Sequence, residues 1–227
     1  MPDKKNILII GASSEIAQGI AQELKITDAY TILTTTREGG SDFTLELTSD
    51  SSIEEFKKNI AETPLSWVFY CAGFIEPQES TEIFDSNYGE RSKKINFESA
   101  VNLLQTLIPQ IESHGGIVCL SSTAGIWGNP DFPLYSTWKG ALNIYLQSLS
   151  KKLSETGTYV FSICPGPTNT RMRQLVAGDA SEHQSPLVVA KHIITIINQP
   201  ENYKDSPLLI IRNGTLFKVE HELHSLL

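Results

Sequence analysis

The sequence has no long apolar run and no surplus of basic residues. No apolar stretch approaches the roughly 20 residues that a membrane-spanning helix needs, and the run of four at residues 7–10 is too short for a signal peptide. We therefore expect a cytoplasmic protein that does not enter a membrane. The formal net charge is −8, which argues against nucleic acid as a partner because nucleic-acid-binding proteins usually present a basic face.

Cysteine pairs at metal-ligand spacing are also missing. Cys71, Cys119 and Cys164 each lie in or at the end of an apolar, strand-like run, and no CxxC motif is present. We expect reduced thiols in the core and no metal site. His221 and His224 are only a faint sign of a metal, because no other ligands accompany them.

What the sequence does have is a regular alternation of short apolar runs with helical patterns. Its 227 residues, 40% hydrophobic, are typical of one globular domain, which we expect to span residues 1–227. Predicted strands cover residues 6–10, 30–36, 43–47, 65–73, 116–122, 158–166 and 207–214. Predicted helices cover residues 15–24, 51–61, 86–113, 135–154 and 186–198. The alternation predicts an α/β fold, a single doubly wound (Rossmann-type) parallel sheet with helices on both faces.

The connection between the second and third predicted strands is unusually short. Only the six residues 37–42 separate them, whereas a parallel crossover usually needs a dozen or more. Either the crossover is a bare loop leading to a very short strand, or residues 43–47 are not a parallel strand. We favour the bare loop. The helix that follows begins with Ser51 or Ser52 as its expected cap.

A turn of small residues, GASSEIAQG at 11–19, follows the first strand. Such a turn leaves free N–H groups at a helix start, where the helix dipole also favours an anion. Doubly wound folds hold a dinucleotide pyrophosphate in this way. Only Gly11 occupies a fingerprint glycine position, so a plain strand–helix turn with a serine cap explains the same residues equally well.

The second strand ends in TTTR, with Arg37 where a carboxylate would hold the ribose hydroxyls of NAD. An arginine at this place suits a 2′-phosphate, which it can bind through bidentate charge-assisted hydrogen bonds. The alternative is a solvated loop arginine. If a dinucleotide binds, the sequence therefore favours NADP(H) over NAD.

Five further stretches, taken together, resemble the short-chain dehydrogenase/reductase family along nearly the whole chain. They are YCAG at 70–73, IN at 95–96, LSSTAG at 120–125, YSTWK at 135–139 and PGPTNT at 165–170. Their order and spacing match the family, including the thirteen residues between Ser122 and Tyr135.

The resemblance implies four catalytic residues. Tyr135 is similar to the general acid of carbonyl reduction, or the base of the reverse reaction, and Lys139 to the partner that lowers the tyrosine pKa and holds the nicotinamide ribose. Ser122 is similar to the hydroxyl that binds the substrate oxygen, and Asn96 to the residue that supports a water chain to the lysine. Residues four apart on a helix share one face, so Lys139 can approach Tyr135 and stabilise its phenolate.

The resemblance also implies a nicotinamide dinucleotide cofactor, with the segment at 165–170 holding the nicotinamide carboxamide. The cofactor-binding residues implied are Gly11, Ser13, Ser14, Ile16, Arg37, Glu46, Leu47, Cys71, Ala72, Gly73, Tyr135, Lys139, Pro165, Gly166, Thr168 and Thr170.

The chain departs from the family pattern at the glycine turn. Ile10, Glu15 and Ala17 stand where the family usually has a threonine and two glycines, and Ser14 stands where many NADP-using members have a basic residue. The carboxylate of Glu15 starts close to the place of a pyrophosphate, although it can also point outward. YCAG at 70–73 stands where the family has Asn-Asn-Ala-Gly, so one side-chain hydrogen bond that steadies the sheet is missing. These departures put the cofactor affinity in question.

Substrate and assembly are less well defined by the sequence. Residues 171–184 resemble a substrate lid, in which Arg171 and Arg173 either attract an anionic substrate or are simply solvated. Trp127 is a candidate for the substrate pocket and Trp138 for a subunit interface, unless both are core residues. The resemblance implies a homodimer or homotetramer built on the helices around 95–111 and 135–153, to which the tail at 215–227 could add a strand.

The sequence therefore predicts an oxidoreductase that uses NADPH to reduce a small-molecule ketone or aldehyde. The alternative is a dinucleotide-binding sensor or scaffold protein of the same fold without turnover. The altered glycine turn favours this alternative, and the complete set of Asn96, Ser122, Tyr135 and Lys139 argues against it.

Overall fold

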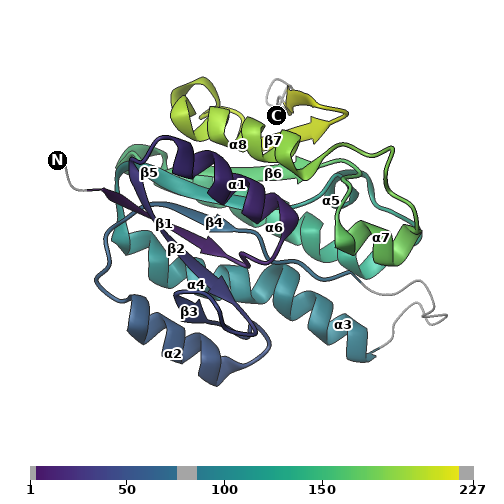
Figure 1. The fold of residues 1–227 in the computed structure, drawn as a ribbon, viewed down its shortest axis with the longest axis horizontal. Coiled ribbons are helices and arrows are strands. Elements are labelled where there is room, and N and C mark those ends of the chain that lie inside the picture. The colour runs from purple at the N-terminus through teal and green to yellow at the C-terminus, as the bar shows by residue number, and fades with distance from the viewer. Residues whose placement is uncertain (1–3, 76–85, 220–227) are drawn as a thin grey trace.

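The computed structural model describes residues 4–75 and 86–219, and one eight-stranded sheet runs through its centre (Figure 1). The strand order is β3-β2-β1-β4-β5-β6-β7-β8, and every pairing is parallel except that of β7 with β8. The strands are β1 (Lys5–Ile10), β2 (Tyr30–Thr36), β3 (Phe43–Thr44), β4 (Leu65–Tyr70), β5 (Ile111–Leu120), β6 (Tyr159–Pro165), β7 (Leu208–Arg212) and β8 (Thr215–Lys218). Because the order reverses between β1 and β4, the predicted doubly wound fold is confirmed.

Helices cover both faces of the sheet (Figure 1). One face carries α1 (Glu15–Ile26) and α8 (Pro186–Asn198); the other carries α2 (Asp50–Ile60), α4 (Ser99–Leu107) and α6 (Pro133–Leu153). Three shorter helices lie near the carboxyl ends of the strands: α3 (Ser86–Lys93), α5 (Ala124–Trp127) and α7 (Arg171–Ala177).

Side chains of the central strands alternate between two apolar cores. Ile7 and Ile9 of β1 pack in the core under α1 and α8, whereas Leu8 and Ile10 pack in the core under α2, α4 and α6. All four are almost completely buried. A parallel strand covered on both faces therefore reads as a continuous apolar run, which explains why the sequence revealed these strands.

The bare loop predicted between the second and third strands is confirmed. β3 pairs with β2 in parallel, and no helix lies between them. Asp42 fastens the loop, since its Oδ2 accepts hydrogen bonds of 2.8 Å from both the backbone N–H and the hydroxyl of Thr34. The strand itself is shorter than predicted, because only Phe43 and Thr44 pair as strand residues.

Two local predictions were wrong. Ser49, rather than Ser51 or Ser52, caps α2, because that helix already begins at Asp50; the Ser49 hydroxyl accepts a bond of 3.3 Å from the Ser52 N–H. The helical region predicted to reach residue 113 ends at a 3₁₀ turn, Ile108–Gln110, and the chain enters β5 at Ile111. Pro109 lies in that turn, where its missing N–H prevents the helix from continuing.

The structure bears on the expected thiols and on possible metal sites. The three cysteines are free and buried, as predicted. Within residues 4–75 and 86–219, no group of three or more His, Cys, Asp or Glu side chains could hold a metal ion, and no helix is both long and apolar enough to cross a membrane. His221 and His224 lie outside the described residues.

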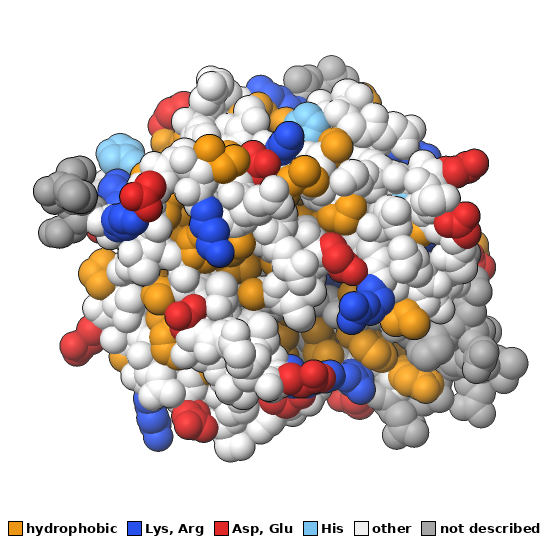
Figure 2. All heavy atoms as spheres, viewed as in Figure 1, with side chains coloured by type: hydrophobic (Ala, Val, Ile, Leu, Met, Phe, Trp, Pro, Cys, Tyr) orange, Lys and Arg blue, Asp and Glu red, His pale blue; other side chains and the backbone are white. Residues whose placement is uncertain are grey.

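Figure 2 shows acidic and basic side chains scattered over the visible face rather than gathered by sign.

Candidate active site

A groove runs along the carboxyl ends of the strands, where doubly wound sheets bind their ligands. It consists of three adjoining cavities, which we name after one lining residue each. The Tyr135 cavity holds about 330 Å³, the Lys139 cavity about 110 Å³ and the Arg37 cavity about 460 Å³. Tyr135 lines the first two cavities, and Ala72 and Gly73 line the second and third. The shared walls join the three cavities into one groove.

Lys139 lies at the bottom of this groove, on α6. Its Nζ donates a hydrogen bond of 2.8 Å to the Leu120 carbonyl at the end of β5, and the residue is only 2% exposed. Burial lowers the pKa of Lys139 to about 8, because the charged ammonium loses its hydration. The Nζ atom is 5.8 Å from the centre of the Tyr135 ring. The i, i+4 spacing therefore places the two side chains on one helix face.

Ser122 reaches the same cavity as Tyr135, from the segment that follows β5. Its Oγ accepts a bond of 3.1 Å from the Ala124 N–H. Gly125 lets this segment cross α6 closely, since a Cβ there would lie 2.6 Å from the Lys139 carbonyl carbon. The Ser121 hydroxyl also donates to the Lys139 carbonyl oxygen at 3.2 Å. These contacts fix the end of β5 against the helix that carries Tyr135 and Lys139.

Asn96 lies beneath the groove and lines none of its three cavities. It is completely buried in a π-helical turn, Lys94–Glu98, between α3 and α4. Its Oδ1 accepts from the Phe74 N–H at 3.1 Å, and its Nδ2 donates to the Phe74 carbonyl at 2.6 Å. A Cβ on Gly73 would lie 3.5 Å from Asn96 Oδ1 and 3.7 Å from Lys139 Nζ. Asn96 thus holds the loop that passes next to the lysine.

The turn after β1 keeps its tight shape although two family glycines are missing. Gly11 has a φ of +82°, and a Cβ there would lie 2.8 Å from the Ala72 N–H nitrogen. Only glycine meets both conditions. The Glu15 carboxylate has a partner beside the turn, since its Oε1 accepts a bond of 2.8 Å from the Arg171 N–H at the start of α7, and Glu15 lines the Lys139 cavity. The open turn and the start of α1 fit the pyrophosphate of a dinucleotide.

The side chain that names the Arg37 cavity is exposed, unlike Lys139. The Arg37 side chain is 55% exposed and forms an ion pair of 2.6 Å with Glu38. Glu46 Oε1 accepts bonds from the Thr48 N–H at 2.9 Å and the Thr48 hydroxyl at 2.8 Å. Arg91 from α3 and Arg171 from α7 also line the cavity. This end therefore combines three arginines with carboxylates that already have partners.

Comparison with known proteins identifies the family. Residues 5–180 match the family model described as short chain dehydrogenase. This chain belongs to that family. Its members are oxidoreductases.

Individual relatives agree with this assignment. An uncharacterized oxidoreductase of Staphylococcus epidermidis is 25% identical over 88% of this chain and 93% of its own length. A 3-ketoacyl-(acyl-carrier-protein) reductase from Brucella melitensis, solved with NADH, superposes with a TM-score of 0.75 at 15% identity, over 86% of this chain and 91% of that one. A Burkholderia cenocepacia short chain dehydrogenase, solved with NADP, superposes with a TM-score of 0.74 at 20% identity, over 85% of this chain and 90% of that one.

The structure of this short-chain dehydrogenase brings nearly all of the predicted site residues together. All sixteen predicted cofactor-binding residues line one of the three cavities, and Ser122 lines the Tyr135 cavity. Asn96 alone lies behind the groove wall. Trp127, the candidate for the substrate pocket, lines the Tyr135 cavity, whereas Trp138 stacks on Phe97 with ring centres 6.5 Å apart.

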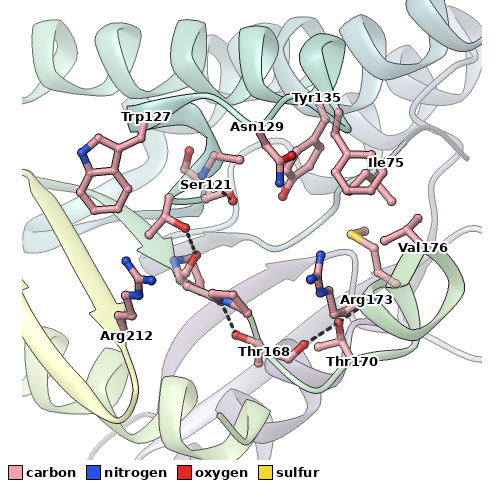
Figure 3. Close-up of a pocket in the computed structure, with 18 of the residues that line it drawn as sticks. Ile75, Ser121, Trp127, Asn129, Tyr135, Thr168, Thr170, Arg173, Val176 and Arg212 are labelled. Carbon is pink, nitrogen blue, oxygen red and sulfur yellow. Dashed lines mark hydrogen bonds between the residues drawn. The ribbon is translucent and has the colours of Figure 1, made fainter. Parts of the chain in front are cut away.

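Other lining residues gave no signal in the sequence. Arg212 at the end of β7 lines the Tyr135 cavity, and Arg91 lines the Arg37 cavity. The two arginines of the predicted lid lie in different cavities: Arg173 lines the Tyr135 cavity and Arg171 lines the Arg37 cavity. Figure 3 shows Arg173 and Arg212 on different sides of the Tyr135 cavity, the former near Val176 and the latter below Trp127.

Proposed function

We propose that this short-chain dehydrogenase uses NADPH to reduce a ketone or an aldehyde by hydride transfer, with Tyr135 as the proton donor. One observation carries the proposal: Ser122 and Tyr135 line one cavity, and the buried Nζ of Lys139 lies 5.8 Å from the Tyr135 ring. The whole chain, residues 1–227, acts as the catalytic domain. Bound NADPH supplies the hydride, and the protein supplies the proton and the binding site for the substrate oxygen.

The proton comes from the Tyr135 hydroxyl. A free tyrosine has a pKa near ~10, too high for ready proton transfer at neutral pH. The ammonium of Lys139, held in a site with little water, stabilises the phenolate that remains after the transfer. The Ser122 hydroxyl donates a hydrogen bond to the substrate oxygen as negative charge develops there. Asn96 acts indirectly, by holding the loop at residues 73–74 against Lys139.

The preference for NADPH rests on charge at the far end of the groove. Arg37, Arg91 and Arg171 line the Arg37 cavity, and Lys94 lies in the adjoining surface hollow. A 2′-phosphate carries charge that arginines bind through paired hydrogen bonds. The same cavity contains Glu38, which pairs with Arg37, and Glu46, so its lining has three arginines against two glutamates and keeps an excess of positive charge. The arginines of this cavity therefore suit a phosphate better than a bare hydroxyl pair.

We expect a cytoplasmic homodimer or homotetramer that uses α4 and α6 as its interface. Ile144 supports this, because it lies on the outer side of α6 and is 66% exposed. A large apolar side chain left open to water on a long helix is typical of a surface that packs against another subunit.

The test is NADPH consumption with a panel of ketones and aldehydes, followed by the Tyr135→Phe variant. Loss of the hydroxyl removes the proton donor, so we expect turnover to fall by about 10²- to 10⁴-fold while NADPH still binds. Tyr145→Phe is the matched control, because Tyr145 lies on the same helix and packs against Phe97 away from the groove. It should retain turnover.

Unchanged turnover in Tyr135→Phe would refute the mechanism. Tight cofactor binding without turnover on any carbonyl compound would favour the sensor or scaffold alternative. That alternative draws its support from the altered glycine turn, in which Glu15 lines the groove and accepts a bond from the Arg171 N–H.

A further inference from the structure

We infer that the carbonyl substrate carries an anionic group, a carboxylate or a phosphate, which Arg173 and Arg212 bind in the Tyr135 cavity. This inference rests on the proposed function, since it names the substrate class of the same site. It starts from an imbalance of charge. Among the residues that the structure describes, those lining the cavity include these two arginines and no aspartate, glutamate or lysine.

The imbalance runs against the composition of the protein. The chain has 26 acidic and 18 basic residues, so a randomly placed cavity would be lined more often by carboxylates. A cavity lined by one sign of charge raises the local concentration of ligands of the opposite sign. In a protein of net charge −8, a local cationic site favours the approach of an anionic substrate.

Among the described residues, the side chain of Arg173 has an unmet hydrogen-bond donor. Its Nε is buried without a hydrogen-bond acceptor, and among the described residues it forms no ion pair. Arg37, by contrast, pairs with Glu38. A guanidinium that is partly removed from water without an acceptor is unfavourable. A ligand carboxylate or phosphate would supply the missing acceptor, and its two oxygens match the paired N–H groups of arginine.

Arg212 approaches from another part of the fold, at the end of β7. Its side chain packs on Gly166, where a Cβ would lie 2.9 Å from Arg212 Cγ. Glycine at position 166 therefore leaves room for this side chain beside the segment that resembles a nicotinamide-binding loop. In the parts of the chain that the structure describes, Arg212 also has no ion pair. Figure 3 shows it below Trp127, across the cavity from Arg173.

If the arginines of residues 171–184 were simply solvated, Arg173 would be expected to face water as Arg171 does. Arg171 lies two residues before Arg173, is exposed, and belongs to the Arg37 cavity. Arg173 instead turns toward Ser122 and Tyr135, the groups proposed to bind the carbonyl oxygen. The cavity holds about 330 Å³, at the lower limit of small-molecule sites. The segment expected to hold the nicotinamide, residues 165–170, also lines it, so only part of this volume is left for the substrate. The expected substrate is thus a small oxo acid or a small phosphorylated ketone or aldehyde.

The experiment compares charged and neutral forms of the same carbonyl compound, using the full chain with NADPH. One arm pairs 2-, 3- and 4-oxo acids with their methyl esters, and the other pairs dihydroxyacetone phosphate with dihydroxyacetone. We expect kcat/KM to be about 10- to 100-fold higher for the anion in one of the arms. The arm that shows the preference identifies carboxylate or phosphate.

The variants Arg173→Gln and Arg212→Gln should each lower kcat/KM for the anion by about 10-fold or more and leave the neutral compound unchanged. Lys152→Gln is the control, because it removes an exposed charge from the far end of α6. Circular dichroism and the KM for NADPH show whether a variant still folds and binds cofactor. If these variants change the KM for NADPH and leave kcat/KM for the anionic substrate unchanged, the inference is overturned.

A second readout separates this inference from the proposed function. Calorimetric titration with pentanoate and with pentanamide needs no turnover. Binding of pentanoate alone, lost in Arg173→Gln, supports the anion site even if no carbonyl compound is reduced. Equal kcat/KM for acids and esters, and for phosphorylated and free ketone, overturns the inference while the reductase proposal stands.

Discussion

The two ends of the groove are built in different ways. At the Lys139 cavity the charged group is buried, since Lys139 is 2% exposed and its Nζ is hydrogen-bonded to the end of β5. At the Arg37 cavity the charged group is a loop side chain, 55% exposed and paired with its neighbour Glu38. Buried groups are held by packing, whereas exposed ion pairs contribute little. The catalytic end is therefore fixed by the core, and the cofactor end depends on surface side chains.

Lys139→Met, at the catalytic end of the groove, should cause the largest loss of activity. We expect kcat to fall by about 100-fold or more, because the buried ammonium no longer stabilises the Tyr135 phenolate. Steady-state NADPH oxidation with the substrate found in the screen measures it. Lys152→Met, an exposed lysine of the same helix, should stay near the wild-type rate. A fall of less than threefold in Lys139→Met would show that the buried charge is not used.

The same lysine should make stability depend on pH. Burial lowers the pKa of Lys139 from 10.5 to about 8, so between these values the unfolded chain binds a proton that the folded chain does not. The free energy of unfolding of the wild type should therefore rise, relative to Lys139→Met, by about 2 kcal/mol between pH 8 and pH 9.5. Urea unfolding of both proteins at several pH values tests this. A difference that stays constant with pH would contradict burial of the charge.

A smaller effect should follow from Arg37→Gln at the other end. We expect KM for NADPH to rise by about 10-fold and KM for NADH to stay unchanged, because only NADPH carries the 2′-phosphate. The value of kcat should also be unchanged, since the catalytic end is separate. Lys58→Gln, on the exposed side of α2, provides the control. Equal changes for both cofactors would remove Arg37 from phosphate recognition.

The smallest effect should come from Glu15→Gln. The amide oxygen can still accept from the Arg171 N–H, but the negative charge near the turn is gone. We expect cofactor to bind about two- to threefold more tightly at low salt, as measured by fluorescence titration. Glu23→Gln on the same helix should show no change. Weaker binding of Glu15→Gln by tenfold would mean that the carboxylate itself holds the lid helix in place.

The sequence predicted the fold well wherever strands are buried on both faces, as in β1 and β4, because such strands are continuous apolar runs. The third strand was predicted too long. Leu45 still bonds to the Thr36 carbonyl, but the chain then turns toward α2. The bounds of α4 were also missed, since the change from helix to strand at Ile111 follows a proline turn within an apolar sequence.

The site was predictable where a motif lies within one segment, as for Tyr135 and Lys139 on α6. It was not predictable where separate elements converge. Arg212 reaches the Tyr135 cavity from β7 and Arg91 reaches the Arg37 cavity from α3, and neither has a local pattern. The direction of Glu15 depended on the start of α7, far away in sequence. Only the folded chain brings these groups together.

The most direct test of the central claim is a fluorescence titration of the full chain with NADPH and with NADH, for the wild type and for Tyr135→Phe. We predict that NADPH binds about 10-fold or more tightly than NADH, and equally to both proteins, because the adenosine end sets affinity and the catalytic end sets chemistry. A failure of both cofactors to bind the wild type would contradict the account.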